Sequence, residues 1–204
     1  MGSTAPFVLT GCADAATLAR VRAALTAPGV AFVDSVAALR HLLRAPPTGV
    51  RLAAVEADYD VRGAAAFLEH HGDARIVFVV RDAVDVLRAE PGTMERWRTR
   101  CVEFFAWPEE RSLVVRWEKL CADPTGQLAR IAAHLELPAD GFDAAALVPP
   151  GAATETVSLT DWWATQRTDN RDAIRQAGYP DPRRDARLAL WSSVRTTFGQ
   201  LARR

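Results

Sequence analysis

Short apolar runs that are typical of buried strands recur along most of the chain. The strongest is RIVFVVRD at residues 75–82, an uninterrupted β-branched and aromatic stretch of the kind that is buried on both faces of a sheet. Shorter runs predict further strands at residues 7–10, 31–34, 50–59 and 112–118. Since helical patterns separate these strands, the order favours right-handed parallel βαβ units.

Apolar positions three and four residues apart predict the helices between and after these strands. Asp14 and Asp123 are the expected N-caps of two of them, the second with Pro124 at its first position. Residues 139–161 are rich in Ala, Gly and Pro and predict an ordered loop or a partly mobile flap. The predicted helices cover residues 15–25, 36–43, 64–71, 84–89, 94–105, the segment from Pro124 onward, 169–177 and 186–202. The pattern as a whole predicts an α/β fold, a three-layer sandwich with a parallel sheet between helices.

The composition is that of an ordinary soluble globular protein. The 204 residues are 49% hydrophobic and 25% charged, and no linker-like stretch divides them, so we expect a single domain over residues 1–204. The 25 basic and 25 acidic side chains balance, which gives no reason to expect nucleic acid or a membrane surface as a partner. No segment has the pattern of a signal peptide or of a membrane span, and we expect a cytoplasmic protein.

The cysteines predict neither a disulfide framework nor a metal site. Cys12, Cys101 and Cys121 are three in number and show no C-x-x-C pairing, so we interpret them as reduced thiols and expect no bound metal.

The stretch LTGCADAATLARV at residues 9–21 is expected to lead from the first strand, through a glycine turn at Gly11, into the first helix. A helix N-terminus at such a place presents unpaired backbone N–H groups to an anion. Here, however, the turn carries Ala13, Ala15 and Ala16 around the negatively charged Asp14. As an N-cap, the Asp14 carboxylate would itself occupy the anion position.

Three stretches resemble blocks of the sulfotransferase superfamily in their order and approximate spacing. They are ARIVFVVRDAVDVLRAE at 74–90, LVVRWEKLCADPTGQLARIAAHLELP at 113–138 and, more weakly, NRDAIRQAGYP at 170–180. The resemblance implies a P-loop-like fold. It also implies transfer of a sulfuryl group from 3'-phosphoadenosine 5'-phosphosulfate to a hydroxyl or an amine.

The residues that such a donor would need are only partly present. The 5'-phosphosulfate loop of the superfamily reads like R-S-G-T-T, and residues 13–17 match it only at Thr17. Arg81 stands where the 3'-phosphate is bound, but Ala89 replaces the serine that completes that site. Trp117 replaces the tyrosine of the R-Y-E block, where it would offer an aromatic face to an adenine ring or belong to the core. Thr17, Arg81 and Trp117 are therefore the cofactor-binding candidates if a nucleotide is bound.

A polar group lies at the end of the strand predicted at 50–59, where the superfamily often has a lysine or an acidic group. The residues at this strand end are Glu56, Ala57, Asp58 and Tyr59, so the lysine is missing. Because open α/β sheets bind ligands at the carboxyl ends of their strands, Glu56, Asp58 and Tyr59 are candidates for acid–base catalysis. A solvated turn explains them equally well.

Four further residues are candidates for the wall of a ligand pocket. Trp162 and Trp163 would form a lid over an apolar ligand, or else dock onto the core. The candidate pocket residues are Asp14, Arg62, Trp162 and Trp163.

The leading hypothesis is a sulfotransferase-fold protein with a degraded sulfate-donor site and no expected cofactor. It would bind or transform a small organic molecule, as in specialised metabolism, without sulfuryl transfer. One alternative is an active sulfotransferase that uses 3'-phosphoadenosine 5'-phosphosulfate. Another is a non-catalytic protein that stabilises or regulates a partner. A homo-oligomer is compatible with each hypothesis.

Overall fold

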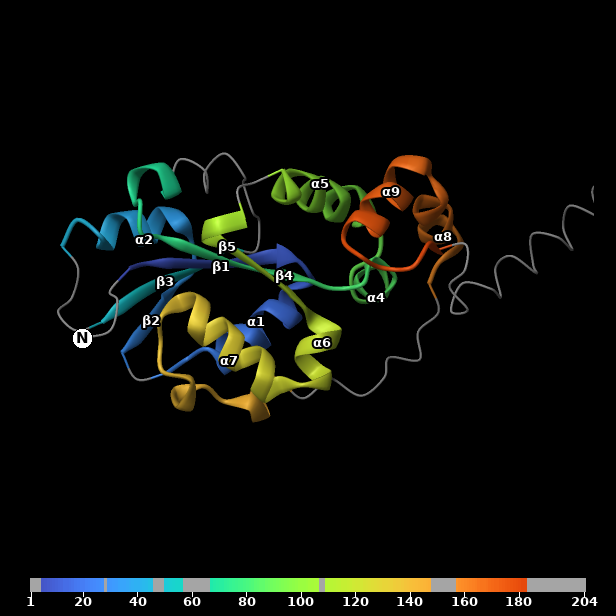
Figure 1. Cartoon of the computed structure of the whole chain (residues 1–204). Helices are drawn as coiled ribbons and strands as arrows, with labels where there is room; N and C mark the ends of the chain where they lie inside the picture. The colour runs from blue at the N-terminus through green and yellow to red at the C-terminus, as the bar shows by residue number, and fades with distance from the viewer. Residues whose placement is uncertain are drawn as a thin grey trace, which may run out of the picture. The chain divides into compact units, whose positions relative to one another are not determined.

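The fold is a parallel sheet with helices on both faces, as expected. The computed structural model describes residues 5–27, 29–45, 50–56, 67–106, 109–147 and 157–182 (Figure 1). Within these ranges, five parallel strands form one sheet in the order β2-β3-β1-β4-β5. The strands are β1 (Phe7–Cys12), β2 (Val30–Val33), β3 (Arg51–Glu56), β4 (Arg75–Val80) and β5 (Ser112–Arg116).

The helices follow the predicted order closely. Residues 67–70 are also helical, and single 3₁₀ turns occur at Glu109–Arg111, Ala139–Gly141 and Ala144–Leu147. The α-helices are α1 (Ala15–Ala24), α2 (Val36–Leu42), α4 (Ala83–Ala89), α5 (Met94–Phe105), α6 (Trp117–Ala122), α7 (Pro124–Leu135), α8 (Leu159–Gln166) and α9 (Thr168–Gln176). The helix predicted at 186–202 lies outside the described residues.

The contacts group the chain into two compact units. The sheet unit comprises residues 1–81 and 106–152 and contains all of the strands named above. The helical unit comprises residues 82–105 and 153–204 and contains α4, α5, α8 and α9. The expectation of a single domain stays a prediction.

In the sheet unit, alternate residues of the central strands face opposite helical layers. Phe7 and Leu9 of β1, with Val77 and Val79 of β4, belong to one core cluster with side chains of α1 and α7. The intervening residues of β1 and β4, such as Phe78, are also fully buried. Figure 1 shows α1, α6 and α7 on one face of the sheet, and α2 with residues 67–70 on the other. The expected three layers are therefore confirmed.

The first strand is longer than the pattern predicts. β1 continues through Gly11 and Cys12, so the glycine lies inside the strand and the expectation of a glycine turn is wrong. A Cβ at Gly11 would overlap the backbone carbonyl of Val79, its neighbour in β4. Glycine is needed here because two backbones approach closely, not because the chain turns.

The strand predicted at 112–118, by contrast, ends earlier than expected, at Arg116. Trp117 is the first residue of α6, and the N-cap, Arg116, makes no side-chain capping bond. Since no Ser, Thr, Asp or Asn marks this helix start, the sequence carries no signal for it. α8 begins inside the predicted loop at 139–161, where Ser158 caps it by accepting a bond from the Asp161 amide.

The end of α7 is fastened to the amino-terminal ends of two strands. Arg51 donates to the Leu135 carbonyl and Arg75 to the His134 carbonyl. Arg75 also pairs with Glu136, the left-handed C-cap residue. Cations at a helix C-terminus compensate the free carbonyls and the helix dipole. We call Arg51, Arg75 and Glu136 the α7 clamp.

We expect His134, beside this clamp, to make the fold sensitive to mild acid. Its Nε2 lies 3.2 Å from the Ile76 carbonyl oxygen. Burial lowers the pKa of His134, and the nearby Arg75, Arg51 and Arg130 lower it further, although the contact with Ile76 raises it. The folded protein therefore binds this proton less readily than the unfolded chain does.

We expect the free energy of unfolding to fall as the pH drops below the ordinary histidine value of about 6.5, and His134→Gln to reduce that fall. The depressed pKa gives stability that is fully present above this pH and is lost as His134 becomes protonated. Urea unfolding between about pH 5 and pH 8 measures the slope. An unchanged slope in the variant, whose amide still reaches the Ile76 carbonyl, would assign the acid sensitivity to other groups.

Candidate functional site

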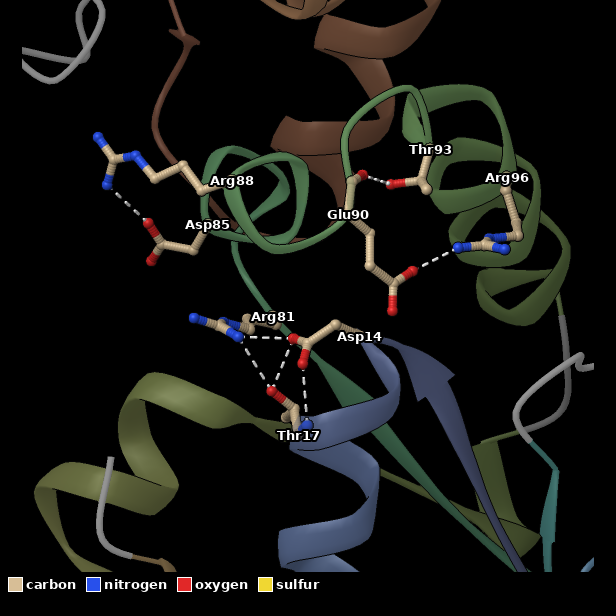
Figure 2. A network of polar contacts seen from close by, with 8 residues as sticks. All are labelled: Asp14, Thr17, Arg81, Asp85, Arg88, Glu90, Thr93 and Arg96. Atoms are coloured by element: carbon tan, nitrogen blue, oxygen red, sulfur yellow. Dashed lines mark hydrogen bonds and ion pairs between the residues drawn. The ribbon is translucent and has the colours of Figure 1, made fainter. Parts of the chain in front are cut away.

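The N-terminus of α1 is closed by its own cap residue. β1 ends at Cys12 and places Asp14 directly before the first turn of α1. Asp14 Oδ1 accepts a hydrogen bond from the Thr17 backbone N–H at 3.0 Å, and Oδ2 accepts one from the Thr17 hydroxyl at 2.7 Å. The predicted N-cap is confirmed, and its carboxylate lies over the helix N-terminus (Figure 2).

Arg81 completes this arrangement from the neighbouring strand. Its Nη1 donates to Asp14 Oδ2 at 2.5 Å and to the Thr17 hydroxyl oxygen at 3.1 Å. The sheet brings the residues together, because β1 and β4 are adjacent and the Arg81 N–H donates to the Cys12 carbonyl at 3.2 Å. Side-chain exposure is 4% for Asp14 and 17% for Arg81, so the ion pair is largely shielded from water.

Thr17 and Arg81 together hold Asp14 as a carboxylate. Burial alone would raise the pKa of Asp14. The bonds from the Thr17 hydroxyl and amide and from Arg81, together with the Arg81 charge, outweigh burial and leave the pKa below its ordinary value. Asp14 therefore carries a permanent negative charge at neutral pH.

These contacts decide what the helix N-terminus can bind. A backbone N–H, a hydroxyl and a guanidinium converge on one place, and these are the donors that an oxyanion needs. The Asp14 carboxylate already accepts from all three. It would also repel a second anion about 4 Å away by about 1 kcal/mol in water and about 4 kcal/mol in a partly dry site.

The candidate catalytic residues lie mostly beyond the described part of the chain. Glu56 is the last residue of β3, and the strand register pairs it with Thr10 of β1, at the same sheet edge from which Asp14 follows. Asp58, Tyr59 and the pocket candidate Arg62 lie outside the described residues. A catalytic role for Glu56, Asp58 and Tyr59 stays a prediction.

The three candidate tryptophans differ in exposure. Trp117 is 5% exposed and belongs to the core cluster of the sheet unit, which favours the alternative that it is a core residue. In the helical unit, Trp162 is 5% exposed and packs with Val84 and Val157, whereas Trp163 is 45% exposed. The two rings meet edge to face with centroids 4.8 Å apart. One ring is thus docked, as the second interpretation expects, and the other faces solvent.

The remaining chemistry of the described residues is sparse. Cys12, Cys101 and Cys121 are free cysteines. No group of three or more His, Cys, Asp or Glu in the described ranges could hold a metal ion. No helix in the same ranges has the length and apolar character needed to cross a bilayer.

The sequence predicts each half of this site but not their contact. Arg81 is followed directly by Asp82, which suggests a local ion pair. Asp82 instead caps α4 through the Val84 amide at 2.8 Å, and the guanidinium turns to Asp14, 67 positions away in the chain. Only the adjacency of β1 and β4 brings the two together, and no local pattern carries that information.

Comparison with known proteins identifies the fold. No protein-family model matches the sequence, and no curated protein matches it. Among solved structures, a sulfotransferase from Alicyclobacillus acidocaldarius is 12% identical, with a TM-score of 0.58 over 85% of this chain and 96% of that one. Mouse sulfotransferase SULT7A1 complexed with PAP is 13% identical, with a TM-score of 0.51 over 67% of this chain. The present chain spans 60% of the mouse protein.

Proposed function

Because the chain has the sulfotransferase fold, we propose that it is a member of that superfamily with a degraded sulfate-donor site. In this proposal the protein binds or transforms a small organic molecule and transfers no sulfuryl group. The observation that carries the proposal is the Asp14 carboxylate, which accepts from Thr17 and Arg81 at the N-terminus of α1.

The residues present do not fit a phosphosulfate group. Such a group carries several negative charges and needs unengaged donors and a net positive surrounding. At the N-terminus of α1, the Asp14 charge balances that of Arg81, and the Thr17 amide and hydroxyl donate to Asp14. Two further departures from the superfamily pattern point the same way. Ala89 replaces the serine, and the end of the strand at Glu56 lacks the lysine.

Chemistry in such a protein would come from the carboxyl edge of the sheet. Glu56 or Asp58 would move a proton to or from a bound organic molecule, with Tyr59 as a second proton donor. Arg81 would act as a positioning residue, because its guanidinium fixes the Asp14 carboxylate. We place this activity in the cytoplasm, with specialised metabolism as its setting.

Thermal unfolding with 3'-phosphoadenosine 5'-phosphate tests the proposal against active sulfuryl transfer. A ligand that binds only the native state raises the unfolding midpoint by mass action. We expect no shift at millimolar ligand in the wild-type protein. A shift of several degrees that disappears in Arg81→Ala would overturn the proposal in favour of an active sulfotransferase.

A different measurement distinguishes the proposed small-molecule protein from the non-catalytic alternative. Size-exclusion chromatography of the protein from its native cell tests for a stable complex with another protein. Elution at the mass of the chain or of its homo-oligomer is expected for a small-molecule protein. Elution in a stoichiometric complex with another chain would favour a scaffolding role.

A further inference from the structure

The α7 clamp lies at the amino-terminal ends of the strands, opposite the edge that carries Asp14. The register pairs Phe7 of β1 with Arg75 of β4, and on its other side with Ala53 of β3, two residues after Arg51. Arg51 and Arg75 therefore lie on either side of Phe7 and on the same face of the sheet. Both reach the last turn of α7, where they donate to the adjacent carbonyls of Leu135 and His134.

In the described part of the chain, no carboxylate contacts the Arg51 guanidinium. Arg51 is 3% exposed, and among the described residues its Nε and Nη2 have no hydrogen-bond partner and no carboxylate pairs with it. Its guanidinium carbon lies 5.6 Å from the centroid of the Phe7 ring, which partly compensates the charge through one face. Burial and the neighbouring Arg75 lower the pKa of Arg51 to about 10. A buried charge is normally paired. The edge of the Arg51 guanidinium that carries Nε and Nη2 is an exception among the described residues.

Glu136 already places one carboxylate in the clamp. It adopts a left-handed conformation with φ of 54°, and its side chain is 53% exposed while pairing with Arg75. Glu136 and Asp73 act on Arg51 only through the electrostatic field, which raises its pKa without a direct bond. The clamp therefore has two guanidinium groups and a single carboxylate in contact.

We propose that the α7 clamp is an anion site for an inorganic oxyanion such as phosphate. The oxyanion displaces the Glu136 carboxylate from Arg75 and bridges Arg75 to the Nε–Nη2 edge of Arg51. That edge of a guanidinium offers two parallel donors, which is the geometry for binding an oxyanion through two of its oxygens. The site is independent of the Asp14 arrangement and of the function proposed above.

Phosphate-dependent thermal unfolding at constant ionic strength tests this site. We expect a saturable rise of the midpoint in the wild-type protein. In Glu136→Gln, which removes the competing carboxylate, saturation should come at a concentration about tenfold lower, in line with the loss of a close like-charge repulsion. Arg75→Gln and Arg51→Met should each lose the saturable component.

The controls distinguish binding at the clamp from other effects of phosphate. Each shift is measured within one variant, so a lower starting midpoint in Arg51→Met does not obscure it. Arg81→Gln, at the other end of the sheet, should keep the saturable rise. A rise that is linear in phosphate and equal in all variants is an excluded-salt effect and overturns the proposal. Loss in Arg81→Gln with retention in Arg75→Gln overturns it as well.

Discussion

Replacing Asp14 by alanine should destabilise the protein by about 2–4 kcal/mol. The change removes the N-cap of α1, which alone is worth about 1 kcal/mol. It also leaves Arg81, only 17% exposed, without the carboxylate that accepts its 2.5 Å hydrogen bond. Chemical denaturation of the two proteins, extrapolated to zero denaturant, measures the difference.

Asp14→Asn is the matched control, because asparagine caps helices about as well as aspartate and lacks only the charge. It should be less damaging than Asp14→Ala. It should also lose part of the acid sensitivity of the wild-type protein. The lowered pKa of Asp14 gives stability that is present above the ordinary value of 3.8 and is lost as the pH falls below it. Equal stability of the wild-type and Asp14→Ala proteins at neutral pH would mean that the ion pair contributes nothing.

Gly11→Ala should be more damaging still, with a loss of more than about 4 kcal/mol, a large part of the stability of a typical domain. The added Cβ would overlap the Val79 carbonyl and approach the Val79 amide nitrogen to 2.9 Å. Both are backbone atoms of a central strand, so neither can move without separating β1 from β4. The result should be poor folding or a much lower unfolding midpoint.

Gly72→Ala provides the control for the glycine itself. Apart from its two chain neighbours, no described residue lies within 4 Å of a Cβ at Gly72, and this glycine is exposed. The substitution should change stability by less than about 1 kcal/mol. A similar loss in both variants would show that the close approach of β1 and β4 is not the cause.

The arrangement of the strands could be predicted because buried parallel strands leave a strong local signal. The run at 75–82 contains β4, and the helix predicted at 94–105 has the observed bounds of α5. The start of α6 could not be predicted, since Arg116 caps it without a side-chain bond. Gly11 misled the prediction because glycine is typical of turns, whereas here it permits a close approach between strands.

The candidate site likewise has one feature that the sequence predicts and others that it does not. The Asp14 cap follows from local pattern, because an aspartate before an apolar helix is a common N-cap. The partner of Arg81 does not follow from local pattern. The contact depends on which strands are neighbours and on the direction that the Arg81 side chain takes toward Asp14. Burial of Trp162 beside an exposed Trp163 likewise depends on how α8 packs within its unit.

The proposed loss of donor binding rests chiefly on the Asp14 carboxylate. Calorimetric titration of 3'-phosphoadenosine 5'-phosphate into the wild-type and Asp14→Ser proteins tests that role most directly. Serine keeps the N-cap by accepting from the Thr17 amide, but it removes the negative charge that now engages Arg81 and the Thr17 hydroxyl. We predict no binding to the wild-type protein and millimolar or tighter binding to Asp14→Ser. Binding to the wild-type protein as tight as to Asp14→Ser would contradict the account.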